Sequence, residues 1–341
     1  MSKKLKTGVI GLGRIGQIHL SNLLYHTPNA EVVIASDVST ASHEVAKKAG
    51  VATSTNAEDV INHPDVEAVI ICAPTPLHVP YTIAAAQAKK HIFCEKPLDV
   101  TIPAILSAQK AVKENNVKLM LGFNRRFDPN FARVRSLVLD GSIGDPHIVK
   151  VTSRDPAPPP LEYVKISGGL FLDMTIHDFD MARYITGSEV TEVYVKGDAL
   201  VDPRIKQYND IDTAVITLTF ENGAIGVIDN SRKAVYGYDQ RVEVFGSQGM
   251  AKAENNTPDN VLQYNTTGGL SALPLHFFLE RYEKAYRSCI QTFVDSVIND
   301  VPSPVDAHDG LMATAVGLAA GLSLKEGRPV KVAEILNAIS K

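Results

Sequence analysis

Residues 168–184 carry ionisable side chains at a helical spacing. If this segment forms one helix, at about 100° per residue four of them share one narrow stripe: Asp173, His177, Asp180 and Tyr184. An acid one turn from a histidine can fix the imidazole as a proton acceptor, which makes His177 a candidate general base oriented by Asp173. The alternatives are a structural histidine and a metal site. A metal needs a further ligand that is not evident, so we predict no metal.

A lysine at the end of a strand supplies a second candidate group. The run His91-Ile-Phe-Cys-Glu95-Lys96-Pro97 begins as an apolar strand and ends in polar residues. A proline restricts the residue before it to extended conformations, so Lys96 stays out of a helix. Held over a cofactor, its ammonium can hydrogen-bond a substrate hydroxyl and stabilise the alkoxide as a hydride leaves. A solvated strand-end lysine is the alternative.

A glycine-rich turn near the N-terminus follows an apolar run and precedes a helical pattern. It reads Gly11-Leu-Gly13-Arg14-Ile15-Gly16. In this setting Gly11 permits a tight turn, Gly13 lets the backbone approach a pyrophosphate, and Gly16 lets the helix lie close to the strand. The backbone N–H groups of the helix N-terminus then hold the diphosphate. The motif therefore predicts dinucleotide binding.

An acid ends the second strand run and selects the dinucleotide. Asp37 follows Gly16 by 21 positions (37 − 16), where a carboxylate accepts hydrogen bonds from the adenine ribose and repels a 2′-phosphate. NAD is therefore predicted rather than NADP, and FAD is disfavoured because it usually brings longer insertions. Thr75 and His78 are predicted on the ribose or nicotinamide side, with a plain loop as the alternative for His78. The predicted cofactor-binding set is Gly11, Gly13, Arg14, Ile15, Gly16, Asp37, Thr75, His78, Glu95 and Lys96.

The first 122 residues alternate strand-like and helical patterns. Short apolar runs flanked by helices are typical of a parallel sheet covered on both faces, and right-handed crossovers make this an α/β Rossmann domain. We predict an NAD-binding domain over 1–122. Residues 123–341 are predicted to bind substrate and form oligomers, with the last helix a candidate to return to the first domain.

The second part of the chain has a different pattern. A helix is predicted over 129–139, and the runs 213–220 and 224–229 flank Asn222-Gly223, which favours a hairpin. We expect an α+β domain with a large, mostly antiparallel, open-faced sheet. The uncovered face would carry apolar residues, so sheet-to-sheet packing in a homo-oligomer is expected.

Length and charge exclude several classes of protein. A chain of 341 residues suits two domains, and 45% apolar residues suffice for their cores. A net charge of −4 without a long basic tract disfavours nucleic acid and membrane surfaces as partners. No apolar stretch approaches the ~18 residues of a membrane span. Three separated cysteines without disulfide or zinc spacing indicate a reducing compartment, so a cytoplasmic location is expected.

Three motifs in this order resemble the Gfo/Idh/MocA oxidoreductases: the turn 11–16, Glu95-Lys96-Pro97 and Gly168-Gly169-x3-Asp173-x3-His177. The likeness runs almost end to end and includes Asp309-Gly310 and Gly327-Arg328-Pro329-Val330. Within that family the chain most resembles the inositol 2-dehydrogenases, through the segments 122–128, 153–156 and 236–239.

The resemblance implies an NAD-dependent enzyme that oxidises a ring hydroxyl of myo-inositol or scyllo-inositol to the inosose. It implies a homotetramer and catalytic roles for Lys96, Asp173 and His177. The polyol would be bound by Asn124, Arg125, Asp155, Asp173, His177 and Tyr236. Some myo-inositol enzymes of the family have His and Asn where this chain has Ser153 and Asp155, so the isomer stays open.

Two other functions are retained as alternatives. A dehydrogenase of another sugar or polyol, or an enzyme that reduces a sugar lactone or imine, would use the same machinery. A non-catalytic NAD-binding regulator could be built on the same two domains, but it need not keep both Lys96 and His177.

Overall fold

The computed structural model describes residues 4–338 and divides the chain into two compact units. The first unit runs to Phe127 and also includes Lys284–Thr314. The second consists of Asp128–Glu283 and the chain from Ala315 on. Helix α12 (Ala307–Glu326) begins in the first unit and ends in the second.

The limits of the two compact units differ from the predicted domains 1–122 and 123–341. The segment that rejoins the first unit carries most of α11 (Glu283–Ile298), whereas the last helix, α13 (Val332–Asn337), lies in the second unit. Aromatic contacts explain this return, because Phe293 of α11 packs against Phe93 with ring centroids 5.7 Å apart. The assignment of separate roles to the two parts of the chain stays a prediction.

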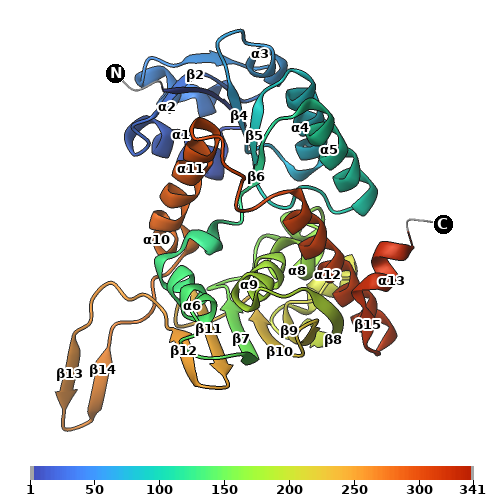
Figure 1. Ribbon diagram of the computed structural model, residues 1–341. Helices are drawn as coiled ribbons and strands as arrows, with labels where there is room; N and C mark the ends of the chain where they lie inside the picture. The colour runs from blue at the N-terminus through green and yellow to red at the C-terminus, as the bar shows by residue number, and fades with distance from the viewer. Residues whose placement is uncertain (1–3, 339–341) are drawn as a thin grey trace. The chain divides into compact units, whose positions relative to one another are not determined.

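A six-stranded parallel sheet forms the centre of the first unit, in the order β3-β2-β1-β4-β5-β6 (Figure 1). Its strands are β1 (Leu5–Ile10), β2 (Ala30–Ser36), β3 (Ala52–Ser54), β4 (Ala68–Ile71), β5 (His91–Cys94) and β6 (Leu119–Leu121). The accompanying helices are α1 (Arg14–Tyr25), η1 (Thr40–His43), α2 (Glu44–Lys48), α3 (Ala57–Ile61), η2 (Thr75–Leu77), α4 (His78–Gln87), α5 (Ile102–Asn115) and η3 (Asn124–Phe127).

Helices cover both faces of this sheet, so its central strands are apolar throughout. All four residues of β4 are fully buried. Helices α1 and α11 lie on one face and α4 and α5 on the other (Figure 1). Cys94 and Cys289 are buried within this unit, and burial raises the pKa of both thiols. The Rossmann prediction is confirmed.

The second unit is built on a seven-stranded sheet in the order β12-β11-β7-β10-β9-β8-β15. Its strands are β7 (Pro146–Arg154), β8 (Val190–Asp198), β9 (Thr213–Phe220), β10 (Ile225–Ser231), β11 (Asp239–Gly246), β12 (Gly249–Ala253) and β15 (Val330–Lys331). Strands β7 and β10 are parallel, and every other neighbouring pair is antiparallel. The predicted α+β domain with a mostly antiparallel sheet is therefore confirmed.

Local signals placed several elements of this unit correctly. The Asn222-Gly223 turn joins β9 and β10, with Gly223 at φ +84°, and the Gly223 N–H donates to the Phe220 carbonyl at 3.0 Å. The remaining elements are α6 (Pro129–Leu139), α7 (Leu161–Val164), α8 (Gly169–Asp173), α9 (Ile176–Thr186), η4 (Pro203–Tyr208), α10 (Phe278–Arg281) and a hairpin of β13 (Leu262–Asn265) and β14 (Gly268–Ser271). That hairpin projects away from the main sheet (Figure 1).

One face of the large sheet packs against helices and the other carries exposed apolar side chains. On β9, Ala214, Ile216, Leu218 and Phe220 are buried, while the residues between them are exposed. On the exposed face, a row of four apolar side chains crosses four neighbouring strands, each 45–53% exposed: Met250, Phe245, Ile148 and Ile225. We call this row the open-face row.

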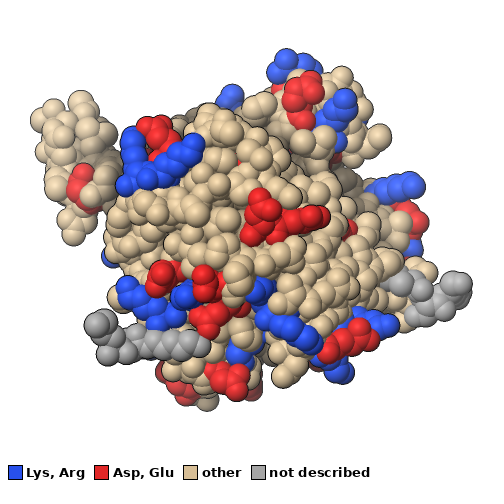
Figure 2. All heavy atoms as spheres, turned by 90° about the horizontal axis from the view of Figure 1, so that it is seen from above, with Lys and Arg blue, Asp and Glu red and all other residues tan. Residues whose placement is uncertain are grey.

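Charge is distributed without a dominant sign on the surface that Figure 2 shows, where acidic and basic side chains are interspersed. Among the described residues, no helix is both long and apolar enough to cross a membrane.

A buried ion pair fixes the start of α6 in the second unit. Asp128 accepts hydrogen bonds from the backbone N–H groups of Asn130 (3.0 Å) and Phe131 (3.1 Å), which caps the helix. Its other oxygen binds Arg281, and both side chains are at most 2% exposed. The Arg281 guanidinium also lies over the rings of Phe131 and Tyr282.

We expect Asp128→Ala to lower the free energy of unfolding by about 3–5 kcal/mol, because it leaves the Arg281 cation buried without its partner. Urea denaturation followed by circular dichroism measures the change. Asp128→Asn keeps a helix-capping oxygen and should be less destabilising. Equal stability of the Ala variant and the unmodified protein would contradict this account.

Candidate active site

The segment 168–184 does not form the one helix on which the predicted stripe depends, because it is divided into two helices. Helix α8 ends at Asp173, and α9 begins at Ile176. At the junction the Thr175 N–H donates to the Leu170 carbonyl at 2.9 Å, and the Asp178 N–H donates to the Thr175 carbonyl at 2.8 Å, so the regular ladder is interrupted. The single stripe is lost with it.

The four residues of that stripe have different surroundings. Asp173 and His177 are half-buried, whereas Asp180 is 1% exposed and lies 3.8 Å from Arg183. Tyr184 lies under the Arg135 guanidinium. Asp180 therefore belongs to the interior of the second unit, and only Asp173 and His177 remain candidates for chemistry.

The Asp173 carboxylate is held from both sides. Its Oδ1 accepts a hydrogen bond from the Tyr163 hydroxyl at 2.9 Å, and its Oδ2 accepts from the two Nη atoms of Arg232 at 3.2 and 3.3 Å. Neither partner was predicted from the sequence. Arg232 directly follows the strand that ends at Ser231. Its position as a charged residue at a strand end is the one feature of the sequence that could have indicated a role in the site.

Arg232 is surrounded by carboxylates although it is only 2% exposed. Its Nη1 lies 3.9 Å from Oδ2 of Asp155. Asp210 is also close: burial raises the pKa of its carboxyl, and the charge of Asp173 acts in the same direction, whereas Arg232 opposes the shift. The structure thus brings the predicted residues Asp155 and Asp173 together around one cation.

A buried polar network ties the start of α9 to the sheet. The Thr175 hydroxyl donates to the Asn230 side-chain oxygen at 2.7 Å, and the Asn230 amide donates to Oδ2 of Asp178 at 2.8 Å and to the Ser153 carbonyl at 3.2 Å. Thr175, Asp178 and Asn230 have no exposed surface. Because His177 lies between Thr175 and Asp178, this network fixes the backbone that carries the imidazole.

Tyr236 lies in a neighbouring polar cluster. Its hydroxyl donates to Oδ2 of Asp239 at 2.6 Å and accepts from Nη1 of Arg154 at 2.8 Å. Arg154 also forms a two-pronged pair with Asp229, and this pair raises the pKa of the guanidinium further. The Tyr236 hydroxyl is therefore already oriented by charged neighbours, while its role as a substrate ligand stays a prediction.

In the first unit, the predicted cofactor segments gather at one edge of the sheet. Strands β1, β4 and β5 are parallel and in register, with Ile10 opposite Ile71 and Ile71 opposite Cys94. The turns that follow them therefore lie at the shared carboxyl edge, where ligands bind in open α/β sheets. This edge holds the glycine-rich turn, Thr75 and Lys96.

The glycine-rich turn has the geometry of an anion cradle. A Cβ on Gly16 would lie 1.9 Å from the Gly11 carbonyl oxygen, and one on Gly11 would lie 2.6 Å from the Cys72 carbonyl oxygen. A Cβ on Gly13 would meet no atom within 4 Å, so this side of the turn is open. Helix α1, which begins at Arg14, has neither an acid in its first turn nor a side-chain cap, which leaves its first N–H groups for an anion.

Asp37 stands at the end of β2 beside this turn. Its Oδ2 accepts from the Leu12 N–H at 2.7 Å, and its Oδ1 accepts from the Ser39 N–H at 2.8 Å. The carboxylate is half-buried and keeps lone pairs for a ribose. Arg14 is exposed, and Ile15 and Thr75 are half-buried.

Two predicted cofactor residues, Glu95 and His78, are buried within the first unit. Oε1 of Glu95 is hydrogen-bonded to Nε2 of His19 at 2.7 Å, and a Cβ on Gly122 would lie only 2.7 Å from the Glu95 carboxyl carbon. His78 is 2% exposed and its two ring nitrogens lie 2.7 Å from the carbonyl oxygens of Ala73 and Pro97. Burial lowers the pKa of His78, and the carbonyls oppose that shift. Both residues therefore brace the backbone around Lys96, which itself is half-buried.

Asn124 and Arg125, predicted to bind substrate, begin the short helix η3 of the first unit and are buried. The Asn124 N–H donates to the Gly122 carbonyl at 2.8 Å. Lys96, Asn124 and Arg125 belong to one unit, and Asp173 and His177 to the other. Their meeting in one site stays a prediction.

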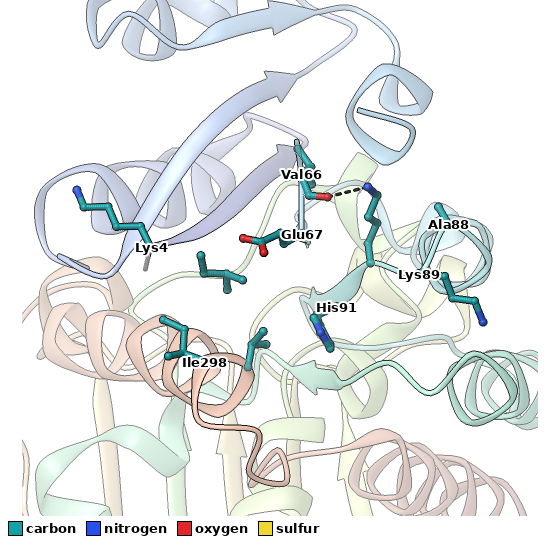
Figure 3. Close-up of a pocket in the computed structure, with 10 residues that line it drawn as sticks. Lys4, Val66, Glu67, Ala88, Lys89, His91 and Ile298 are labelled. Carbon is teal, nitrogen blue, oxygen red and sulfur yellow. Dashed lines mark hydrogen bonds between the residues drawn. The ribbon is translucent and has the colours of Figure 1, made fainter. Parts of the chain in front are cut away.

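A cavity of about 570 Å³ lies at the opposite edge of the parallel sheet (Figure 3). It is lined by residues at the amino ends of the strands, among them Leu5, Glu67 and His91, and by Ile298 of α11. It is distinct from the carboxyl edge that carries the cofactor set. Within residues 4–338 no group of three or more His, Cys, Asp or Glu side chains is arranged to hold a metal ion.

Comparison with known proteins identifies the family. Residues 5–123 match the family model of the oxidoreductases with an NAD-binding Rossmann fold, and residues 131–252 match the GFO/IDH/MocA C-terminal domain. The chain is 48% identical to the uncharacterised oxidoreductase YrbE of Bacillus subtilis, covering 97% of this chain and 98% of the relative. It is also 48% identical to the myo-inositol 2-dehydrogenase of Thermotoga maritima, covering 97% of this chain and all of the relative.

A solved structure extends this likeness to a complex. The scyllo-inositol dehydrogenase of Lactobacillus casei, with bound NAD(H) and scyllo-inositol, has a TM-score of 0.90 and 33% sequence identity, over 97% of this chain and all of that chain. The protein is thus a two-unit, NAD-binding oxidoreductase. It belongs to the Gfo/Idh/MocA family.

Substitutions at two of the three glycines of the turn, Gly13 and Gly16, should have different effects. Gly13→Ala should leave the free energy of unfolding nearly unchanged but weaken NAD binding at least about tenfold, because its methyl group occupies the space of the pyrophosphate. Gly16→Ala should also destabilise the unit, because its Cβ has no space. NADH fluorescence titration and urea denaturation separate the two effects. Unchanged NADH affinity in Gly13→Ala would contradict the cradle.

Proposed function

We propose that the protein is an NAD-dependent inositol 2-dehydrogenase that oxidises a ring hydroxyl of myo-inositol or scyllo-inositol to the inosose. The observation that carries the proposal is the end-to-end likeness to two named inositol dehydrogenases, one of them solved with NAD(H) and scyllo-inositol bound. The residue types support it: Asp155 and Asp173 lie around Arg232, and His177 follows Asp173 by four residues. Carboxylates and an imidazole suit a neutral polyol better than a phosphorylated substrate.

Three residues have proposed catalytic roles. His177 takes the proton of the reacting hydroxyl, and Asp173 orients the imidazole and stabilises the imidazolium that forms. Lys96 donates a hydrogen bond to the same oxygen and stabilises negative charge on it. Bound NAD supplies the hydride acceptor.

The remaining polar residues would position the ring. Asn124, Arg125, Asp155 and Tyr236 offer donors and acceptors to the other hydroxyls of the polyol. A stereoisomer whose hydroxyl points elsewhere would leave a buried polar group of the site without its hydrogen bond. Such a site can therefore discriminate strongly among stereoisomers. The contribution of the protein is then mainly orientation.

NADH production across myo-inositol, scyllo-inositol and glucose tests the function. We expect turnover with at least one inositol. His177→Ala should lower kcat by at least about 100-fold, since general-base catalysis contributes roughly 10²–10⁴-fold, with NAD affinity unchanged. His276→Ala, at an exposed histidine of the second unit, is the matched control and should retain activity.

Three results would revise the proposal. Turnover with glucose alone would make the protein a dehydrogenase of another sugar. Binding of NAD without turnover of any polyol would favour the non-catalytic regulator. Full activity of His177→Ala would remove this residue as the base.

The open-face row supports a homo-oligomer, and a homotetramer is the assembly we propose. Four half-exposed apolar side chains on adjacent strands form a continuous surface that is costly to leave in water. A two-fold axis would bring the same row from two copies together. The two buried, unpaired cysteines of the first unit support a cytoplasmic location.

Ile148→Lys combined with Phe245→Lys should reduce the mass of the assembly, because the two charges enter the middle of the open-face row. Sedimentation velocity measures the mass. Leu139→Lys is the control, because Leu139 is also an exposed apolar residue but lies in α6, outside the sheet. It should leave the mass unchanged. An unchanged mass in the double variant would place the interface elsewhere.

A further inference from the structure

We propose that Arg232 is a positioning residue of the active site: a buried cation that holds the carboxylates of Asp155 and Asp173 in one arrangement. The inference rests on the proposed dehydrogenase function, in which Asp173 orients the base and Asp155 binds the polyol. Arg232 would act through these two carboxylates rather than on the reacting atoms.

The contacts of the guanidinium carry the proposal. Both Nη atoms reach Oδ2 of Asp173, at 3.2 and 3.3 Å, and Nη1 lies 3.9 Å from Oδ2 of Asp155. Arg232 is 2% exposed, so these pairs are only weakly screened by water. The planar fork of an arginine can face two carboxylates at once, which a lysine ammonium does not match.

The negative charges around Arg232 require a cation at this position. Asp155, Asp173 and Asp210 are the carboxylates near it, and their mutual repulsion would favour separation or protonation without Arg232. The positive charge of the guanidinium compensates these carboxylates.

The backbone shows that four separate segments meet at Arg232. Asp155 follows β7, and its N–H and carbonyl bond Ser231 and Ala234, on either side of Arg232. Asp210 accepts from the Leu170 N–H at 2.8 Å, in the helix that ends at Asp173. Arg232 itself donates its backbone N–H to the Asp212 carbonyl at 2.8 Å. Arg232 therefore lies where the ends of β7 and β10, the segment 210–212 and the end of α8 come together.

The experiment compares Arg232→Ala and Arg232→Lys with the unmodified enzyme. We expect Arg232→Ala to lower kcat with the preferred inositol at least about 30-fold and to raise the KM for the polyol, with NADH affinity within about twofold. Arg232→Lys should recover only part of kcat, because it restores the charge without the fork. Added guanidinium ion, at millimolar concentration, should raise the activity of Arg232→Ala and leave the unmodified enzyme unaffected.

A matched control separates positioning from stability. Arg183→Gln removes another buried arginine of the same unit, which pairs with Glu189 at 2.6 Å, and should destabilise the protein without lowering kcat. The proposal is overturned if Arg232→Ala folds and retains kcat and KM. It is also overturned if Arg232→Ala loses no more activity than Arg183→Gln and added guanidinium does not restore that loss.

The two proposals fail separately. Turnover of the unmodified enzyme tests the dehydrogenase function, and the ratio between variant and unmodified enzyme tests Arg232. If a different polyol is the substrate, the same ratios measured with that polyol still decide the role of Arg232.

Discussion

A carboxylate taken out of water must be matched by hydrogen-bond donors, and in the second unit this requirement decides where the candidate catalytic groups lie. Asp178 has no exposed surface, and it is matched by the Asn230 amide of β10. Asp212 is equally buried and accepts from the backbone N–H groups of three successive residues, 200–202, at 2.8–2.9 Å.

These matched carboxylates form the support of the site. Helix α9 cannot slide along the sheet without breaking the contact between Asp178 and Asn230, so His177 is carried on a fixed backbone. Asp173, at the end of the preceding helix, is held by hydrogen bonds from Tyr163 and Arg232. Asp173 and His177 are half-buried, whereas Asp178 and Asn230, which support the backbone of α9, are fully buried. Precision at the site therefore derives from polar groups that never meet substrate.

Periodicity and turn chemistry predicted the elements well, because these signals are local. The helix 129–139 and the hairpin around Asn222-Gly223 occur as predicted, and the parallel sheet follows from short apolar runs between helices. The glycine-rich turn was also readable, since its spacing reflects backbone contacts that a Cβ would break.

The sequence did not predict the contacts between segments that are distant along the chain. Helical spacing suggested one continuous stripe, but the break after Asp173 depends on contacts with Asn230 and Asp210 far along the chain. Arg232 was missed for the same reason, since its partners Asp155 and Asp173 lie far from it in the sequence. Glu95 and His78 follow strands, and the sequence did not show that their side chains turn inward to His19 and two carbonyl oxygens. Their contact with the cofactor stays a prediction.

The burial of Cys94 and Cys289 has a practical consequence. Both lack exposed surface, and their raised pKa values keep them as neutral thiols near physiological pH. Peroxide and alkylating reagents act on accessible thiolates, so neither sulfur is a target while the unit stays folded. A cysteine introduced on an exposed helix would then react ahead of both. The third cysteine, Cys72, is half-buried, so its replacement would complete a host for a spectroscopic label.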